Sequence, residues 1–453
     1  MSAGRTAATA AAIVTVARAT TGTGDAATVI DAKYRRTILE NGIRVVTEQI
    51  PYIKSASLGI WVDVGSRNED ARINGISHFI EHMCFKGTKR RNAKEIAQSL
   101  ETLGGTLNAF TSREHTCYYC RVLDEHFDIG FDVLADIVTD SVFDPTELER
   151  EKEVILEEIK DVFDTPADLV HDYFAGAVWD PHPLGQTIMG EADGIKKLMR
   201  QDLVDFVSRN YTADRIIVAA AGAVEHERVV ELTEKALHVG RPNGGNQLTR
   251  PIYEHGQRII HRRDLTQTHI CLGFPSIPFD DPDRYTMLIL NTLLGSGMGS
   301  RLFQSVREER GLVYSIYSYQ DFYHDTGLFG IYLGTDTNKA REALTVILQE
   351  LAAVKAEALT EAEIELSKSQ LKGSMMLSLE GSYNRMNRLA RHELFLHEFV
   401  SLEQTATEID AVTLADVRRL AQRVFDERLL TMVALGPVAE KLKDQVDWSV
   451  LKN

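Results

Sequence analysis

Hydrophobic and polar positions recur along the chain with two periods, one of two residues and one of about 3.6, which indicate strands and helices respectively. The first clear signal is a pair of apolar runs that flank Asn41-Gly42, a dipeptide typical of a tight hairpin turn. The first series of expected strands is 37–40, 43–46, 55–64, a long strand from the Gly104-Gly105 turn through 122, and 216–222. The helices expected among them are 75–86, 93–103, 124–142, 144–163 and 226–237.

A second series of elements follows a Gly- and Asn-rich stretch at residues 240–246, which has the composition of a linker. The expected strands are 268–274, 311–319, 327–335 and 429–435, and the expected helices are 285–294, 338–356, 360–377 and 414–425. Because the order of elements recurs after roughly two hundred residues, the pattern favours gene duplication. We therefore expect an α+β fold with two homologous α/β-sandwich-like domains, each a sheet plus helices. Their expected ranges are 36–240 and 251–453, with a short linker at 241–250.

Residues 1–35 are expected to precede the folded part, which should begin near Arg36. Residues 1–30 are rich in Ala and Thr, carry Arg5 and Arg18, and have no acid before Asp25. That composition resembles a weak transit peptide. A poor signal-peptide core at 7–17 and a disordered extension on a cytosolic protein are the alternatives.

Composition narrows the class of protein. A chain of 453 residues exceeds one typical domain, and a formal net charge of −16 argues against nucleic acid or an anionic membrane as a partner. The same charge mildly favours basic peptides, and no apolar run is long enough to cross a bilayer. The four cysteines form no disulfide framework. Cys117 and Cys120 lie in a strand-like run, where residues three apart face opposite ways, so a reducing compartment is expected.

One segment combines metal-ligand spacing with a candidate general base. Residues 78–82 read His-Phe-Ile-Glu-His. On a helix, His78 and His82 lie on one face and can reach one metal ion, and Glu81 lies on the adjacent flank. Two imidazoles and one more anionic ligand leave a fourth zinc position for water, from which Glu81 could take a proton. The order H-x-x-E-H is the inverzincin signature. The alternative interpretation is two histidines on an ordinary amphipathic helix with a solvated Glu81.

The surrounding sequence resembles the pitrilysin-like inverzincin metallopeptidases of family M16. The matching segments are Gly-Ser-Arg-Asn-Glu at 65–69, Gly-Ile-Ser-His-Phe-Ile-Glu-His-Met at 75–83, Phe-Lys-Gly-Thr at 85–88, and the runs at 39–46 and 111–116. Within that family the chain resembles the processing-peptidase branch, which includes the mitochondrial processing peptidase β subunit. The last two runs are more similar to bacterial members, and the resemblance covers nearly all of residues 36–445.

This resemblance implies a third zinc ligand on a later helix. The position that matches the family's ligand is Glu158, and the neighbouring Glu157 is the runner-up. A further family glutamate, two helical turns earlier, matches Glu151 and implies a supporting or electrostatic role in catalysis. The helix is crowded with acids, so a solvated face or a pair with Lys152 is the alternative for each. The implied cofactor is one Zn²⁺ per chain.

The second half supplies another element of the family pattern, an Arg and a Tyr seven positions apart. The matching residues are Arg307 and Tyr314. The resemblance implies that Arg307 binds a peptide carbonyl near the zinc, and that Tyr314 holds the scissile carbonyl and stabilises the oxyanion. A surface arginine and a core tyrosine are the alternative.

The family also holds its substrate as an added strand on the edge of a sheet. The matching residues are Asn108, Ala109, Phe110 and Thr111. An interior strand is the alternative. In the mitochondrial subunit, acids downstream of the third ligand recognise a substrate arginine. Asp168 and Asp172 fall near those positions, although residues 165–167 depart from that subunit's sequence, so a preference for arginine stays open.

The expected function is that of a zinc metalloendopeptidase of the processing-peptidase type, acting on extended or unfolded peptides. Two such units should close a chamber. A homodimer is expected because residues 295–300 do not resemble the glycine-rich loop of the non-catalytic mitochondrial partner; a heterodimer with such a subunit is the alternative. Two further functions remain open, a core subunit of a respiratory complex and a zinc-dependent peptide-binding protein. The expected compartment is the bacterial cytoplasm, with the mitochondrial matrix as the alternative.

Overall fold

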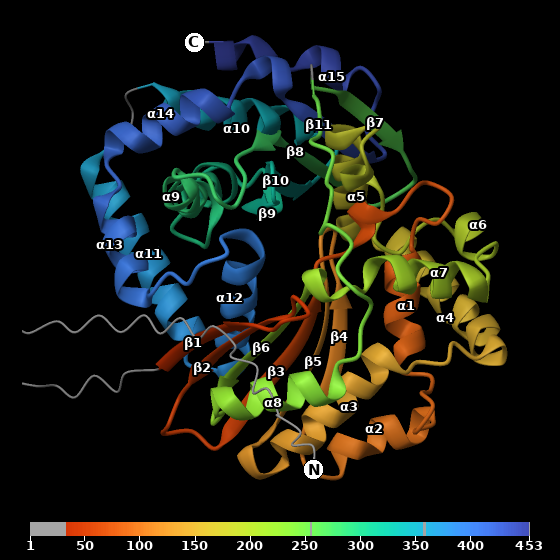
Figure 1. Ribbon diagram of the computed structural model, residues 1–453. Helices are drawn as coiled ribbons and strands as arrows, with labels where there is room; N and C mark the ends of the chain where they lie inside the picture. Colours follow the sequence, from red (N-terminus) through yellow and green to blue (C-terminus); the bar gives the residue numbers. More distant parts are fainter. Residues whose placement is uncertain (1–32, 254–255, 357–358, 453) are drawn as a thin grey trace, which may run out of the picture.

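The computed structural model describes residues 33–253, 256–356 and 359–452 (Figure 1). The expected N-terminal extension therefore lies outside the described residues, apart from 33–35. The first strand begins at Lys33, slightly ahead of the start near Arg36 that the sequence indicates.

The first half forms a six-stranded sheet in the order β1-β2-β6-β3-β5-β4. Its strands are β1 (Lys33–Ile38), β2 (Arg44–Gln49), β3 (Ser55–Val62), β4 (Thr106–Thr111), β5 (Thr116–Leu123) and β6 (Ile216–Gly222). The turn at Asn41-Gly42 joins β1 and β2 as an antiparallel pair, as predicted. The single long strand expected after the Gly104-Gly105 turn is wrong, because the chain reverses at residues 112–115 and makes the β4–β5 hairpin. This hairpin leaves β4 at the edge of the sheet.

The second half forms a five-stranded sheet in the order β7-β11-β8-β10-β9. Its strands are β7 (Arg258–Arg262), β8 (Thr268–Ser276), β9 (Val313–Phe322), β10 (Gly327–Thr335) and β11 (Thr431–Gly436). This order repeats β2-β6-β3-β5-β4, and the parallel pair β7–β11 repeats the parallel pair β2–β6. The two-sheet α+β fold and its internal duplication are thus confirmed, although the sequence pattern does not indicate β7.

Helices surround both sheets. Those of the first half are α1 (Ile76–Cys84), α2 (Ala93–Glu101), α3 (Phe127–Thr139), α4 (Pro145–Asp164), α5 (Pro166–Trp179), α6 (Ala192–Ile195), α7 (Arg200–Asn210) and α8 (His226–Ala236). Those of the second half are α9 (Arg284–Gly295), α10 (Ala340–Lys355), α11 (Glu361–Ser378), α12 (Ser382–Phe395), α13 (Leu402–Ala411), α14 (Leu414–Val424) and α15 (Leu442–Gln445). The sequence pattern locates most of the long helices but does not indicate α5, α7, α12 or α13.

The two halves exchange one helix each. Helix α5 of the first half packs on β8 and β11, where Phe174 shares a buried cluster with Val433. Helix α12 of the second half packs on β2, β3 and β6, where Met386 shares a buried cluster with Trp61 (Figure 1). Since α5 and α12 hold the same place in the order of elements, the exchange is reciprocal. Each sheet therefore needs the other half to cover one of its faces.

The remaining sequence expectations concern the cysteines and the membrane. All four cysteines are buried and free. Cys117 packs on the side of α12 and Cys120 on the opposite side of the sheet, as the strand pattern predicts. Among the described residues, no helix is both long enough and apolar enough to span a bilayer.

Candidate metal centre

A buried carboxylate caps the N-terminus of α1, the helix that carries the H-x-x-E-H segment. Glu69 accepts hydrogen bonds from the backbone N–H groups of Gly75 (2.7 Å) and Ser77 (2.8 Å), and from the Asn74 side chain (3.0 Å). These bonds satisfy orphan donors at the N-terminus of α1, where a negative charge also complements the helix dipole. Burial raises the pKa of Glu69 to about 7, although its hydrogen bonds favour the ionised form. The sequence carries only one weak signal for this role, an acid shortly before the helix start, and the role was not predicted.

Three side chains converge at α1 and α4. The Nε2 atoms of His78 and His82 lie 3.2 Å apart, and Oε2 of Glu158 lies 3.8 Å and 3.6 Å from them. A zinc ion about 2.1 Å from each of two tetrahedral ligands would hold those ligands about 3.4 Å apart. The donor set and its spacing therefore fit a zinc ion. Glu157, the runner-up, is exposed and pairs with Lys160 instead.

Helix α4 brings a second acid to the same place. Glu151 lies two turns before Glu158 and is buried. Its Oε2 lies 3.1 Å from Nδ1 of His82, and its Oε1 lies 2.6 Å from Nζ of Lys86. A carboxylate on the far nitrogen of a ligand imidazole fixes its tautomer and its orientation. Glu151 is thus placed to orient His82 so that Nε2 faces the other two ligand atoms.

Burial sets the protonation of the first histidine. Burial and, to a smaller extent, the neighbouring His82 together lower the pKa of His78 to about 4. A neutral imidazole is the form that binds a metal ion, so His78 is ready to act as a ligand near neutral pH. Nδ1 of His78 is buried without a hydrogen-bond partner among the described residues.

Glu81 faces a cavity of about 360 Å³ beside the ligands. Residues of this cavity are His78, Glu81, Ala109, Phe110, Thr111, Asp172, Ile188 and Met189. The hydroxyl of Thr111 donates a hydrogen bond to Oε2 of Glu81, and burial raises the pKa of Glu81. Three of the lining residues belong to β4. Because β4 is an edge strand, the interior-strand alternative is wrong, and the cavity lies against an edge strand of the sheet.

The two downstream acids are placed differently. Asp172 on α5 lines the cavity, 3.7 Å from a guanidinium nitrogen of Arg113. Burial raises the pKa of Asp172 despite this cation. Asp168, one turn earlier, is exposed and does not line the cavity.

The Arg–Tyr pair of the second half lies outside this cavity. Arg307 is exposed in a π-helical stretch (Phe303–Glu308), with its guanidinium 4.8 Å from the Phe303 ring centre. Tyr314 is 60% exposed near the start of β9, the edge strand of the second sheet, so it is not a core tyrosine. Among the described residues, no hydrogen bond or ion pair links either side chain to the three converging ligands.

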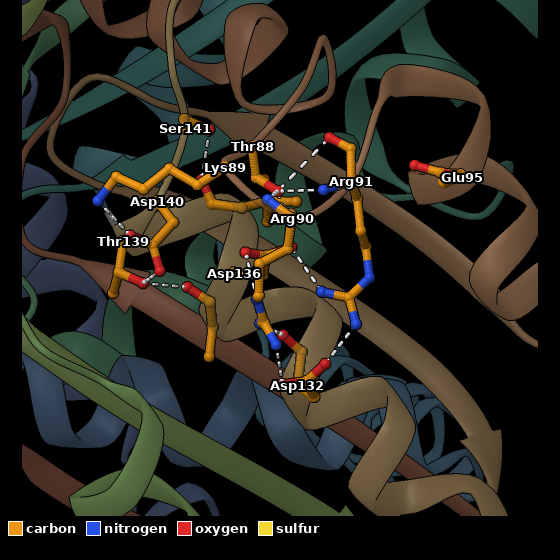
Figure 2. A network of polar contacts seen from close by, with 12 residues as sticks. Thr88, Lys89, Arg90, Arg91, Glu95, Asp132, Asp136, Thr139, Asp140 and Ser141 are labelled. Atoms are coloured by element: carbon orange, nitrogen blue, oxygen red, sulfur yellow. Dashed lines mark hydrogen bonds and ion pairs between the residues drawn. The ribbon is translucent and has the colours of Figure 1, made fainter.

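A charged network fixes the loop that follows α1 (Figure 2). The fully buried carboxylate of Asp136 accepts hydrogen bonds from Thr88 (2.9 Å), Arg90 (3.0 Å) and Arg91. Asp132, one turn earlier on α3, pairs with the same two arginines. Two carboxylates and two guanidinium groups thus anchor the loop between α1 and α2 on α3. The sequence signal, acids four residues apart on one helix face, does not reveal which cations they meet.

Comparison with known proteins decides the family. The family model described as Insulinase (Peptidase family M16) matches residues 44–192, and the model described as Peptidase M16 inactive domain matches residues 197–371. The chain belongs to peptidase family M16. The three converging ligands and Glu81 lie within the first match, and Arg307 and Tyr314 lie within the second.

Individual M16 relatives span nearly the whole chain. The uncharacterized zinc protease YmxG of Bacillus subtilis is 40% identical over 393 residues, which is 87% of this chain and 96% of that protein. The mitochondrial-processing peptidase subunit beta of Saccharomyces cerevisiae is 35% identical over 419 residues, covering 89% and 91%. A chain of complex III2 from Candida albicans, with Inz-5 bound, superposes with a TM-score of 0.80. At 20% identity, covering 93% of this chain and 99% of that one, it shows a shared fold alone.

Proposed function

We propose that this M16 chain is a zinc-dependent metalloendopeptidase of the processing-peptidase type that cleaves extended or unfolded peptides. One observation carries the proposal: His78, His82 and Glu158 converge with zinc-like spacing beside Glu81 and the free edge of β4. The printed names of its relatives, a zinc protease and a processing peptidase subunit, support the same chemistry.

His78, His82 and Glu158 would hold the zinc ion, which when bound lowers the pKa of a water ligand and polarises a carbonyl. Glu81 then takes the proton of the attacking water and delivers it to the leaving amine. Its raised pKa brings it closer to neutrality, where a base that must also return its proton works best. The Thr111 hydroxyl fixes the rotamer of Glu81 for both transfers.

Strand β4 would bind the peptide through its main chain. An extended peptide that pairs with Asn108, Ala109, Phe110 and Thr111 would extend the sheet by one strand. Backbone pairing places few demands on side chains, so many sequences can be accepted. Asp172 would favour a basic side chain near the scissile bond, and Asp168 would act farther out along the same helix.

The second half would complete the site from across the molecule. Tyr314 would donate to the oxyanion and Arg307 would bind a peptide carbonyl. Their exposure supports such a role, because both functional groups are free to meet a substrate.

Assembly and location belong to the same proposal. Two copies of the chain would close a chamber around the substrate, with a heterodimer containing a related non-catalytic subunit as the alternative. The bacterial cytoplasm is the proposed location, with the mitochondrial matrix as the alternative. The alternative function is that of a core subunit of a respiratory complex. Co-purification with a membrane complex would identify that case. A zinc-dependent peptide-binding protein would bind peptides without cleaving them.

The deciding experiment combines metal analysis with peptide cleavage. The purified full-length chain should contain one zinc ion per chain by mass spectrometry and should cleave quenched peptides. Glu81→Gln should keep its zinc, because the ligands are untouched, and lose at least about a hundredfold in turnover. Glu153→Gln, at an exposed acid of α4, is the matched control and should behave as wild type. Full activity in Glu81→Gln would remove this residue from the mechanism.

The contribution of the second half can be tested at one hydroxyl. Tyr314→Phe should lower turnover roughly ten- to a thousandfold while leaving the zinc content and the substrate affinity nearly unchanged. Tyr52→Phe, at an exposed tyrosine of the β2–β3 turn, serves as the control. Equal turnover in both variants would exclude Tyr314 from oxyanion stabilisation.

A further inference from the structure

A second cavity, of about 480 Å³, lies at α12 and carries an unusual charge. Three arginines line it, Arg284, Arg388 and Arg391, and no Asp or Glu occurs among the described residues of its wall. We call this cavity the arginine pocket. The whole chain has a net charge of −16, so a group of cations without acids is a local feature and does not reflect the composition.

None of the three arginines is neutralised by an ion pair among the described residues. Arg284 is buried and donates to the Phe279 carbonyl (3.2 Å) and the Tyr285 hydroxyl (3.0 Å). Arg388 donates to the Val400 carbonyl and the Thr405 hydroxyl. These partners are neutral, so they satisfy N–H groups without balancing the positive charge.

Arg391 is the least engaged of the three. Its guanidinium lies 5.3 Å from the Phe279 ring centre, and among the described residues it makes no hydrogen bond or ion pair. By contrast, Arg385 on the same helix pairs with Glu48 of the first half. The five N–H donors of Arg391 are therefore available to a ligand in the pocket.

The positive charge of the three arginines also affects the pKa of a neighbouring histidine. The pKa of His392 falls to about 3, first because the ring is buried and then because Arg388, Arg284 and Arg391 repel its charged form. Clustered cations in a cavity are costly unless an anion accompanies them. Asp321 interacts with Arg391 electrostatically across the adjoining cavity, which both residues line, but the two side chains form no ion pair, and burial raises the pKa of Asp321 although Arg113 and Arg391 lower it.

That adjoining cavity, of about 430 Å³, lies between the arginine pocket and the cavity at the candidate metal centre. It shares Phe110 and Ile188 with the cavity at His78. It shares Gln320, Phe322, Asn387 and Arg391 with the arginine pocket. Both halves line this cavity, and Oδ1 of Asn387, one of its lining residues, is buried without a hydrogen-bond partner among the described residues. A peptide held at β4 could therefore extend toward Arg391.

We propose that the arginine pocket binds a carboxylate of the peptide substrate, either an acidic side chain or the C-terminal group, while the scissile bond lies at the metal centre. The inference rests on the proposed peptidase function and specifies its substrate class. A guanidinium group matches a carboxylate through two parallel hydrogen bonds, which lysine cannot reproduce. Preferred substrates thus carry an acid at a fixed distance from the cleavage site. Free phosphate has related chemistry and is tested as a separate ligand.

Binding is measured without cleavage, in the zinc-loaded Glu81→Gln protein. Labelled peptides are compared in pairs that differ only by Glu or Gln at one scanned position, or by a carboxylate or an amide at the C-terminus. One pair should show roughly tenfold tighter binding of the acidic member in fluorescence anisotropy. Adding Arg391→Gln should bring that ratio to about one, and Arg391→Lys should retain part of it. Arg341→Gln, at an exposed arginine of α10, is the matched control and should keep the full ratio.

Three results would overturn the proposal. No acidic preference at any position would do so, and so would a preference that survives Arg391→Gln in a protein with the wild-type unfolding temperature. The third result is that millimolar phosphate alone raises the unfolding temperature in an Arg391-dependent way while the paired peptides bind equally. That result would assign the pocket to a free anion. If the wild-type chain cleaves no peptide and the Arg391-dependent ratio persists, the result supports the pocket and contradicts the proposed peptidase function.

Discussion

Helix pairs α1–α4 and α9–α11 hold equivalent places in the two halves, yet their interiors differ completely. Each pair consists of a helix that follows a central strand, β3 or β8, and a long later helix packed against it. Between α1 and α4 lie two histidines and two glutamates within hydrogen-bonding or ligand distance. Helix α9 instead buries apolar side chains, among them Leu290 and Leu294, and α11 buries Ile364.

This difference separates what the fold requires from what the site requires. In the second half, the sheet-and-helix frame closes with apolar side chains of α9 in its main buried cluster. Polar groups between α1 and α4 therefore add nothing that the frame needs, and burying them costs free energy unless partners compensate. Their partners are one another, Lys86, and in the proposed function a zinc ion. The candidate metal centre thus places polar groups where the equivalent helix α9 of the second half buries apolar side chains.

Separating the halves should have the largest effect, because each sheet borrows a helix. A fragment of residues 1–250 lacks α12, so Trp61 and Ile217 lose their cover, and α5 loses the sheet on which it packs. We expect this fragment to aggregate or to unfold without cooperativity, and to have no peptidase activity. Circular dichroism, limited proteolysis and a cleavage assay check this. Co-expression with residues 251–453 should restore a soluble complex. A monomeric fragment that unfolds cooperatively and cleaves at the full-length rate would show that the halves are independent.

Removing a ligand on α4 should abolish the metal site and leave the frame intact. Glu158→Gln should weaken zinc binding by more than about a hundredfold, since even residues that only support a ligand typically contribute ten- to a hundredfold. Hydrolysis should be lost with the metal, while circular dichroism should stay unchanged. Competition with a chromogenic chelator measures the affinity. Glu157→Gln is the control, because Glu157 is exposed and contacts Lys160. If Glu157→Gln loses zinc and Glu158→Gln retains it, Glu157 is the ligand and the assignment of Glu158 is wrong.

A substitution in the equivalent helix pair of the second half should lower the stability of the protein and leave zinc binding unchanged. Leu290→Ala on α9 removes a fully buried side chain, so the free energy of unfolding should fall by about 2–5 kcal/mol. Zinc content should remain that of wild type, because the ligands belong to the other helix pair. Chemical denaturation and metal analysis of the same preparation test both statements. Loss of zinc in Leu290→Ala at temperatures where the protein is folded would mean that the α9 interface also supports the site.

Local patterns explain which parts of this molecule can be predicted from sequence. The hairpin at Asn41-Gly42 and the helix around residues 78–82 were predicted correctly, because a turn dipeptide and a 3.6-residue period are local signals. Helices α5 and α12 were not predicted, and no local pattern could indicate that each packs on the sheet of the other half, which is distant in sequence. Strand β7 is short and half-exposed, and its partner β11 lies far along the chain.

The site divides in the same way. Sequence spacing identified His78, His82 and Glu81, whereas Glu158 came from the family resemblance; the structure brings these four residues together. The arginine pocket could not be predicted, because α9 and α12 supply its cations and only the folded chain shows that the described residues of its wall include no Asp or Glu. The roles of Arg307 and Tyr314 stay predictions, since the described contacts do not join them to the ligands.

The smallest expected effect concerns the buried cap of α1, which α9 lacks. Glu69→Gln keeps the shape of the side chain but offers one acceptor oxygen in place of two, so an N–H group of Gly75 or Ser77 loses its partner. We expect a loss of about 1–3 kcal/mol in the free energy of unfolding and a modest loss of zinc affinity as α1 loosens. Thermal unfolding and chelator competition measure the two. Glu95→Gln weakens the exposed capping box of α2 and should cost less than about 1 kcal/mol with no change in zinc binding. If both variants lose the same small amount and Glu69→Gln binds zinc normally, the buried carboxylate does not position the helix that carries His78 and His82, and α1 does not depend on this cap.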